Sequence, residues 1–245
     1  MRAARRMIAS SSPTLVLTAH GSADARAAAN TGAVADRIRR MRPEVDMRVA
    51  FCEQSTPNLR DVLADTHDAV VTPFLLADAY HARVDIPAML ADSRAIQADV
   101  LGEDDRLVSV LRQRVGERNV STHDPDVGVL VVAVGSSRSA ANARTAAVAG
   151  ALTVGTRWAG AVTAFATGPQ PSLGEAAQRL RAKGARRLVI APWFLAHGRI
   201  TDRIAEFAVA QGISMTEPLG AHRLVAATVL DRFDAACANV NRVAA

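Results

Sequence analysis

The sequence predicts an α/β protein built from two tandem Rossmann-like halves, each a four-stranded, mainly parallel sheet with helices on both faces. Three observations lead to this prediction. The chain has 245 residues, enough for two domains of ordinary size, and 49% of it is hydrophobic. Short apolar runs alternate with longer segments of helical period. Finally, the second half of the chain repeats the pattern of the first.

The repeat is visible in three segments that match in the same order. A shift of 114 positions, from His20 to Val134, aligns GVLVVAVGSS with the LVLTAHGS stretch, and AFATGPQPSL with AFCEQSTPNL. A shift of 119 positions, from Pro73 to Pro192, aligns VIAPWFLAHGRITDRI with VVTPFLLADAYHARVDI. Such a duplication fixes the architecture. We place the domains at residues 1–122 and 123–245, because the polar stretch NVSTHDPD is the natural boundary.

Each predicted element follows from its local pattern. In the first half we expect strands near residues 14–19, 46–51, 69–75 and 97–101, and helices near 24–41, 57–65, 83–92 and 104–117. The second half repeats this order and ends in a long helix near 220–238. Alternating strands and helices imply parallel pairing through right-handed crossovers, and nearly continuous apolar strands require cover on both faces. We expect the strand order 2-1-3-4.

Composition excludes several classes of function. The formal net charge is +5, but no basic run with interleaved aromatic residues indicates a nucleic-acid partner. Arginine predominates over the single Lys183, which suits carboxylate ligands or reflects codon usage. Cys52 and Cys237 form no CxxC spacing, which argues against a disulfide framework or a zinc ribbon. No apolar run could span a membrane and the N-terminus lacks a secretion signal, so we expect a cytoplasmic protein without a membrane partner.

Three ionisable residues follow predicted strands of the first half. His20 follows the first strand, Glu53 the second and His81 the third. The carboxyl ends of neighbouring parallel strands, about 4.8 Å apart, open on one crevice. Two imidazoles that start so close can share one metal ion at roughly 2.1 Å each. A carboxylate beside them can act as a further ligand or accept protons.

The second half is an internal control for these residues. The duplication replaces the three candidates by residues that cannot ionise: His20 by Val134, Glu53 by Thr167 and His81 by Ile200. Framework glycines, prolines and aromatic residues persist in both halves. A structural role for a single histidine is common, but the loss of all three residues together indicates that the scaffold does not need them. We therefore interpret His20, Glu53 and His81 as a functional site.

These motifs resemble a known family. The strand followed by HGS, FxExxxP after the second strand and PFLLxxxYHxRVDIP around the third are similar to the sirohydrochlorin chelatases of the class II chelatase superfamily, relatives of ferrochelatase. The two-copy length resembles the long form of this family. One departure is Ala79 in DAYH, where the family commonly has glycine.

The resemblance implies that the two chelatase-like halves face each other across a cleft for an open tetrapyrrole. It implies insertion of Fe²⁺ or Co²⁺ into sirohydrochlorin, for sirohaem or cobalamin, without ATP or a prosthetic group. By this resemblance His20 and His81 bind the metal ion, and Glu53 assists as proton acceptor or third ligand. Neutral imidazoles are required, so activity is expected to fall in acid. Both walls come from one chain, so we expect a monomer.

Four further residues are candidates for substrate binding. Gly21 and Ser22 offer backbone N–H groups at a helix start, suited to one of the eight carboxylates of the family substrate. Tyr80 can pack against the macrocycle or anchor the entry to its helix. Arg83 can clamp a carboxylate or pair with Asp85. In the second half, His197 is a candidate for the opposite wall.

Two other functions remain open. A non-catalytic carrier of metal or tetrapyrrole would keep the same site without turnover. A hydrolase that uses Ser22 with His20 would need a nucleophile and base from adjacent loop positions, and the chain has no GxSxG motif. A rate enhancement over spontaneous metal insertion separates the enzyme from the carrier.

Overall fold

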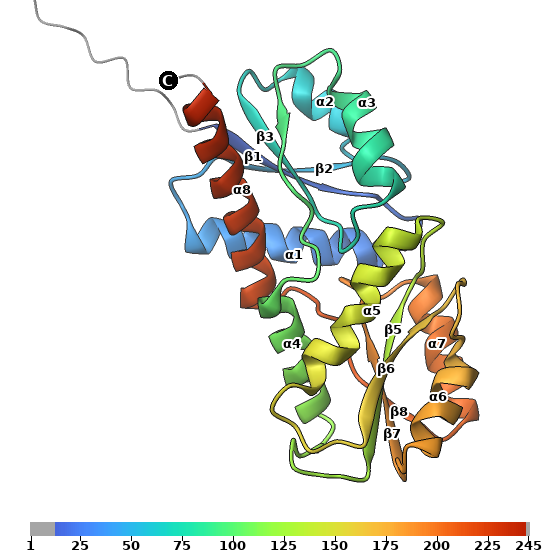
Figure 1. Cartoon of the computed structure of the whole chain (residues 1–245). Helices are drawn as coiled ribbons and strands as arrows, with labels where there is room; N and C mark the ends of the chain where they lie inside the picture. The colour runs from blue at the N-terminus through green and yellow to red at the C-terminus, as the bar shows by residue number, and fades with distance from the viewer. Residues whose placement is uncertain (1–12, 244–245) are drawn as a thin grey trace, which may run out of the picture.

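The computed structural model describes residues 13–243 and contains two four-stranded parallel sheets (Figure 1). The first sheet has the order β2-β1-β3-β4 and the second the order β6-β5-β7-β8, so the predicted order 2-1-3-4 is confirmed in both. The strands are β1 (Thr14–Ala19), β2 (Met47–Phe51), β3 (Ala69–Pro73), β4 (Ile96–Gln97), β5 (Val127–Ala133), β6 (Gly160–Phe165), β7 (Arg187–Pro192) and β8 (Ser214–Met215). The predicted absence of a secretion signal rests on residues outside the described range.

Helices connect the strands in the expected alternation. They are α1 (Ala25–Met41), α2 (Leu59–Ala64), the π-helical turn η1 (His81–Asp85), α3 (Ile86–Leu90), α4 (Asp105–Gly116), α5 (Ser139–Thr153), α6 (Leu173–Ala182), α7 (Arg199–Ala210) and α8 (Arg223–Val243). The first of them, α1, begins where the Asp24 side chain accepts a hydrogen bond from the Arg26 backbone N–H, and it buries Val34 and Ile38. It ends just before Pro43, as the sequence predicts.

Strand register confirms the internal alignment. Corresponding residues of the first and second sheets make the same pairings. Ala19 pairs with Phe51 as Ala133 pairs with Phe165, all at the shift of 114. Thr18 pairs with Pro73 as Val132 pairs with Pro192, with a shift of 114 on the central strand and 119 on its neighbour. The two halves are therefore copies of one unit down to the pairing of single residues.

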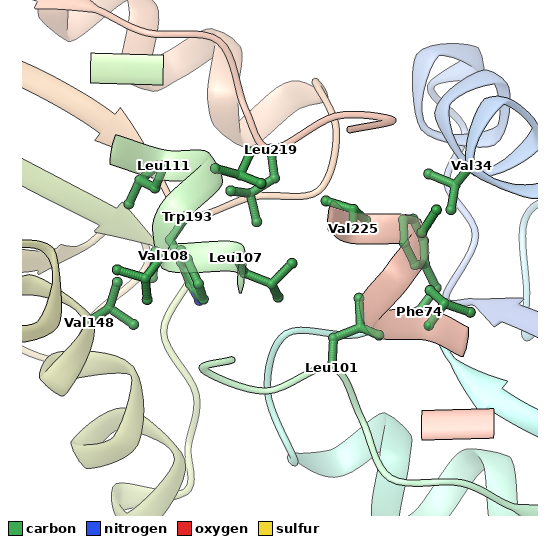
Figure 2. Packing of buried hydrophobic residues seen from close by; sticks show 14 of the residues in the cluster. Val34, Phe74, Leu101, Leu107, Val108, Leu111, Val148, Trp193, Leu219 and Val225 are labelled. Carbon is green, nitrogen blue, oxygen red and sulfur yellow. The ribbon is translucent and has the colours of Figure 1, made fainter. Parts of the chain in front are cut away.

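The last helix of each half crosses to the other half. Helix α4 follows the first sheet in sequence but packs against α5 and β7, whereas α8, at the end of the chain, packs against α1 and β3 (Figure 1). Their apolar faces join one continuous core, in which Leu107 and Val108 of α4 and Val225 of α8 lie between the sheets (Figure 2). The predicted boundary at residues 122 and 123 lies in the connection after α4, and packing does not follow it.

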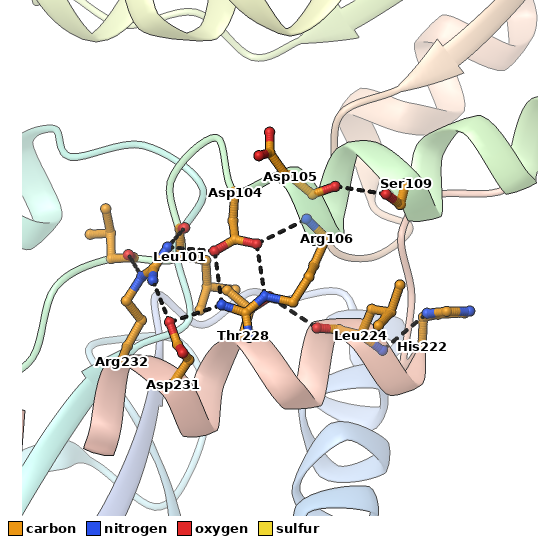
Figure 3. Close-up of polar contacts among 11 residues, drawn as sticks. Leu101, Asp104, Asp105, Arg106, Ser109, His222, Leu224, Thr228, Asp231 and Arg232 are labelled. Carbon is orange, nitrogen blue, oxygen red and sulfur yellow. Dashed lines mark hydrogen bonds and ion pairs between the residues drawn. The ribbon is translucent and has the colours of Figure 1, made fainter. Parts of the chain in front are cut away.

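Ion pairs hold this exchange in place. The Asp104 carboxylate accepts hydrogen bonds from the backbone N–H and side chain of Arg106 at the start of α4, and from Arg232 of α8 at 2.9 Å (Figure 3). Arg232 also donates to the backbone carbonyls of Val100 and Leu101. The predicted strand at 97–101 is therefore too long. It ends at Gln97, because α8 rather than a neighbouring strand binds the carbonyls that follow.

No helix within residues 13–243 is both long and apolar enough to cross a membrane.

Candidate functional site

The loops after β1 and β2 are held together by backbone contacts at the carboxyl edge of the first sheet. Cys52 N–H donates to the Ala19 carbonyl and Glu53 N–H to the His20 carbonyl, both at 3.0 Å. Gly21 lies between these contacts with φ +96°, and a Cβ atom there would be 1.7 Å from the Glu53 carbonyl oxygen. Only glycine allows this approach, so the backbone itself places His20 beside Glu53.

His81 reaches the same place from the loop after β3. The ring centroids of His20 and His81 are 3.9 Å apart, with an angle of 68° between the planes. Both rings are partly exposed. The expectation that two loops distant in sequence meet at one mouth is confirmed by this contact.

Behind the two histidines lies a cleft of about 580 Å³ that is lined by both halves. The first half contributes His20, His81, Tyr80 and the segment Phe74–Ala77, and the second half contributes the loop Val134–Ser137 and the segment Trp193–Leu195. These segments correspond through the duplication. The cleft is therefore a pocket between two related walls, of which only one carries imidazoles.

The contacts of His20 call for a positive charge between its ring and Glu53. His20 Nδ1 lies 2.9 Å from the Gly21 carbonyl oxygen, which can only accept, so Nδ1 carries the proton of this hydrogen bond. His20 Nε2 faces Glu53 Oε1 at 3.1 Å. A lone pair on Nε2 and a carboxylate repel each other unless a proton or a cation lies between them. This arrangement suits a cation that both side chains contact.

His81 is held by a carboxylate one turn further along the chain. Its Nδ1 lies 2.5 Å from Asp85 Oδ2, across the π turn η1, where the Ile86 N–H bonds to the His81 carbonyl. The carboxylate accepts a hydrogen bond from Nδ1–H, and Nε2 keeps its lone pair. Sequence reasoning missed this pair. The HxxxD spacing, which puts two side chains on one face of a helix, is the signal that could have found it.

The site is not a preassembled chelate. No group of three or more His, Cys, Asp or Glu side chains within the described residues meets the geometry of a metal site. The two imidazoles contact each other edge to face. The structure thus provides two adjacent donors and a carboxylate beside them.

Tyr80 lies at the edge of the cleft. Its side chain is 57% exposed, and its ring stands edge to face with His81 at 6.0 Å between centroids. A residue that only anchored its helix would be buried. The exposed ring beside the histidines is available to a flat ligand, as the sequence reasoning proposed, although its role stays a prediction.

Three predicted substrate contacts are placed differently from expectation. Ser22 N–H already donates to Ser55 Oγ, and α1 begins only at Ala25, so Ser22 does not offer a free amide at a helix start. Gly21 and Ser22 are outside the lining of the cleft as the described residues define it. Gly21 instead allows the close approach to Glu53.

Arg83 is also placed differently. Its guanidinium pairs with both carboxylate oxygens of Asp78, five residues earlier, and it is outside the cleft lining defined by the described residues. The expected partner Asp85 is taken by His81. Asp85 lies four residues after His81 and faces it across one turn, whereas Arg83 lies on the side of Asp78.

The structure also shows the surroundings of His197 and Cys52. His197 pairs with Glu217 at 2.7 Å and lines a separate, smaller pocket of about 190 Å³ rather than the main cleft. Cys52 is buried, and burial raises the pKa of its thiol to about 11. The thiol is therefore protonated at neutral pH and is a core residue.

The second wall has a polar loop that sequence reasoning did not assign. Asn142 Nδ2 donates to the Ser136 carbonyl at 2.6 Å and its Oδ1 accepts from the Ser136 N–H at 2.8 Å, and both residues line the cleft. The aligned HGS and VGSS stretches pointed to this loop, but the spacing of six residues between the two partners has no recognisable pattern.

Comparisons with known proteins agree with this architecture. The CbiX family model matches residues 14–118 and 128–236, once in each half. The chain is 26% identical over 174 residues to the sirohydrochlorin cobaltochelatase of Priestia megaterium, an alignment that covers 65% of this chain and 57% of that protein. It is 26% identical over 199 residues to the sirohydrochlorin ferrochelatase of the same organism, covering 76% of this chain and 74% of that one.

Among solved structures, SirB from Bacillus subtilis with Fe³⁺ superposes with a TM-score of 0.80 at 20% identity, covering 93% of this chain and 96% of the other. At this identity the likeness shows the fold alone, and it confirms the predicted α/β class with two tandem halves. The family match extends over most of the chain and confirms the resemblance predicted from the motifs. The chain belongs to the CbiX family.

Proposed function

We propose that this protein inserts a divalent metal ion, Fe²⁺ or Co²⁺, into sirohydrochlorin. The observation that carries the proposal is the pair of imidazoles, 3.9 Å apart, at the mouth of a cleft formed by both halves. Two curated relatives are named for this chemistry with cobalt and with iron, over alignments that span 57% and 74% of their lengths. In this reaction the metal ion is a substrate.

Two side chains deliver the metal ion. His20 and His81 both have Nδ1 bound to an oxygen acceptor, the Gly21 carbonyl and the Asp85 carboxylate, so the Nε2 lone pairs are the available donors. Imidazole is a good ligand for borderline divalent ions, and two ligands hold an ion less tightly than a closed four-ligand site. Weak holding suits an ion that must be passed on to the macrocycle.

Glu53 accepts the protons that leave. Insertion replaces two pyrrole N–H protons by one M²⁺ ion, so charge balances when both protons reach a base. The Glu53 carboxylate contacts His20 Nε2 at 3.1 Å and its side chain is 54% exposed, so it can take a proton at the site and release it to water. Metal arrival at His20 and proton transfer to Glu53 therefore occur at neighbouring atoms.

The cleft fits a flat, partly apolar ligand. Phe74 and Leu75 form part of one wall, and Trp193 and Phe194, their counterparts in the duplication, form part of the other. Tyr80 supplies an exposed aromatic edge beside the metal donors. Both walls come from one chain, which supports the prediction of a monomer. Cytoplasmic location remains a prediction.

A direct assay tests the proposal. Purified protein is mixed anaerobically with sirohydrochlorin and Co²⁺, and in parallel with Fe²⁺, and the absorption spectrum of the macrocycle is followed over time. We expect many turnovers per protein molecule at a rate above that of the spontaneous reaction. Spectral change that stops at one equivalent would support a carrier instead. The comparison of the two metals also shows which is the better substrate.

A further inference from the structure

Asp85 contacts His81, and no role in stabilising the fold explains this contact. Its Oδ2 lies 2.5 Å from His81 Nδ1, and His81 is the only hydrogen-bond or ion-pair partner of this carboxylate within residues 13–243. Asp85 is placed where α3 begins, but its side chain caps no backbone N–H. Its side chain is only 31% exposed. A partly buried carboxylate with one partner, which is an imidazole at the cleft, acts on that imidazole.

The contact decides which nitrogen of His81 is a donor. A carboxylate accepts hydrogen bonds and does not donate them, so the proton of neutral His81 stays on Nδ1 and the lone pair stays on Nε2. The same contact restricts rotation of the ring, which lies beside the His20 ring. For His20 the Gly21 carbonyl accepts the hydrogen bond from Nδ1–H. Asp85 therefore does for His81, with a side chain, what a backbone carbonyl does for His20.

The duplication supports a link between the histidine and its carboxylate. In the second half the place of His81 is taken by Ile200, and α7 runs from Arg199 to Ala210 as a regular helix. At the same shift of 119 positions the place of Asp85 is taken by Ile204, whose side chain cannot accept a hydrogen bond from a histidine. Where the imidazole is lost, the carboxylate and the π turn are lost with it.

We propose that Asp85 is a positioning residue that fixes the Nδ1–H tautomer and the orientation of His81, so that Nε2 receives the incoming metal ion. The proposal rests on the proposed function of His81 as a metal donor. Carboxylates that hold ligating histidines in this way contribute about 10–100-fold to metal affinity or activity.

The test uses the full chain and three variants: Asp85→Ala, Asp85→Glu and, as a matched control, Glu217→Gln, which alters the His197–Glu217 pair outside the cleft. Far-ultraviolet circular dichroism and thermal unfolding check that each variant folds. Imidazole ¹⁵N correlation spectra of the metal-free proteins at neutral pH then report the tautomer of His81. Calorimetric titration with Co²⁺ reports the metal affinity without any tetrapyrrole.

We expect wild-type His81 to carry its proton on Nδ1, and Asp85→Ala to shift it toward Nε2–H and to weaken Co²⁺ binding about 10–100-fold. Asp85→Glu keeps a carboxylate and should recover part of the affinity, and Glu217→Gln should match wild type. A folded Asp85→Ala with an unchanged tautomer, or with Co²⁺ affinity within about twofold of wild type, overturns the proposal.

The two hypotheses fail separately. If the wild-type protein inserts no metal into sirohydrochlorin while Asp85→Ala still shifts the tautomer and weakens Co²⁺ binding, the proposed turnover is wrong and the positioning role stands. If the wild-type protein turns over and Asp85→Ala matches it in both readouts, the positioning role is wrong and the proposed function stands.

Discussion

The loops that follow β1 and β5 have the same backbone conformation, but they carry different side chains. In the first half Glu53 N–H donates to the His20 carbonyl, and in the second half Thr167 N–H donates to the Val134 carbonyl, each at 3.0 Å. The glycines that follow, Gly21 and Gly135, have φ of +96° and +97°. The loop geometry therefore belongs to the fold, and the ionisable side chains of the first half are an addition to it. Predictions that compare equivalent positions separate these two contributions.

The largest difference is expected at the histidines. His20→Ala and His81→Ala each remove one of two metal donors, and we expect each to lower the rate of metal insertion by about 10³-fold, or about 4 kcal/mol of transition-state stabilisation. The matched substitutions Val134→Ala and Ile200→Ala should change the rate far less, because these residues line the cleft without donating to an ion. Initial rates with Co²⁺ check this. Equal losses of rate from the substitutions in the two halves would contradict the assignment of both metal donors to the first half.

The glycines test the part that the halves share. A Cβ at Gly21 would lie 1.7 Å from the Glu53 carbonyl oxygen, and at Gly135 it would lie 1.9 Å from the Gly168 carbonyl oxygen. We expect Gly21→Ala and Gly135→Ala each to reduce the free energy of unfolding by about 2–4 kcal/mol, because both the left-handed backbone and the close approach exclude a side chain.

A helical glycine provides the control. Gly32 lies within α1, and a Cβ there meets nothing within 4 Å. Gly32→Ala should raise stability by about 0.5–1 kcal/mol, since alanine is the better helix former. Chemical denaturation of the three variants measures these changes. A loss of stability in only one of the variants Gly21→Ala and Gly135→Ala would mean that the two loops are not equivalent.

The sequence predicted the parts of this molecule that depend on local pattern and on the repeat. The strand order and the meeting of His20 with His81 follow from where parallel strands end. The exchange of α4 and α8 was not predictable, because helical periodicity shows which face of a helix is apolar but not which sheet that face covers. The partner of Ser22 was not predictable either, since it depends on a side-chain orientation fixed only after a loop folds. The His81–Asp85 pair is different, because its spacing of four residues was a usable signal.

Helices α4 and α8 differ from the loops after β1 and β5, because they join the two halves. Asp104 lies at the centre of this junction and forms ion pairs with both Arg106 and Arg232. Its side chain is only 11% exposed. Burial of Asp104 opposes its ionisation, but the hydrogen bonds and charges of these arginines outweigh burial and hold its pKa below the usual value.

We expect Asp104→Asn to lower the free energy of unfolding by about 2–3 kcal/mol, through a weakened helix cap and two unpaired arginines. A carboxyl with a lowered folded-state pKa stabilises the protein at pH above its unfolded value, near 3.9, and this contribution is lost as pH falls through the folded pKa. Unfolding measured from pH 7 to pH 3 should therefore show a smaller difference between variant and wild type in acid. A constant difference would contradict the charge-based explanation.

The smallest effect is expected at His197, which is the histidine of the second half closest in sequence to the cleft segment Trp193–Leu195. Its Nε2 contacts Glu217 Oε2 at 2.7 Å, and its side chain is 40% exposed in a pocket apart from the main cleft. His197→Ala removes an exposed pair, so we expect the rate of metal insertion and the stability to stay within about twofold and about 0.5 kcal/mol of wild type. Steady-state rates over a range of Co²⁺ concentrations check this. A loss comparable to that of His81→Ala would mean that the rear half also supplies a metal donor, so that the two walls of the cleft share the chemistry as well as the shape.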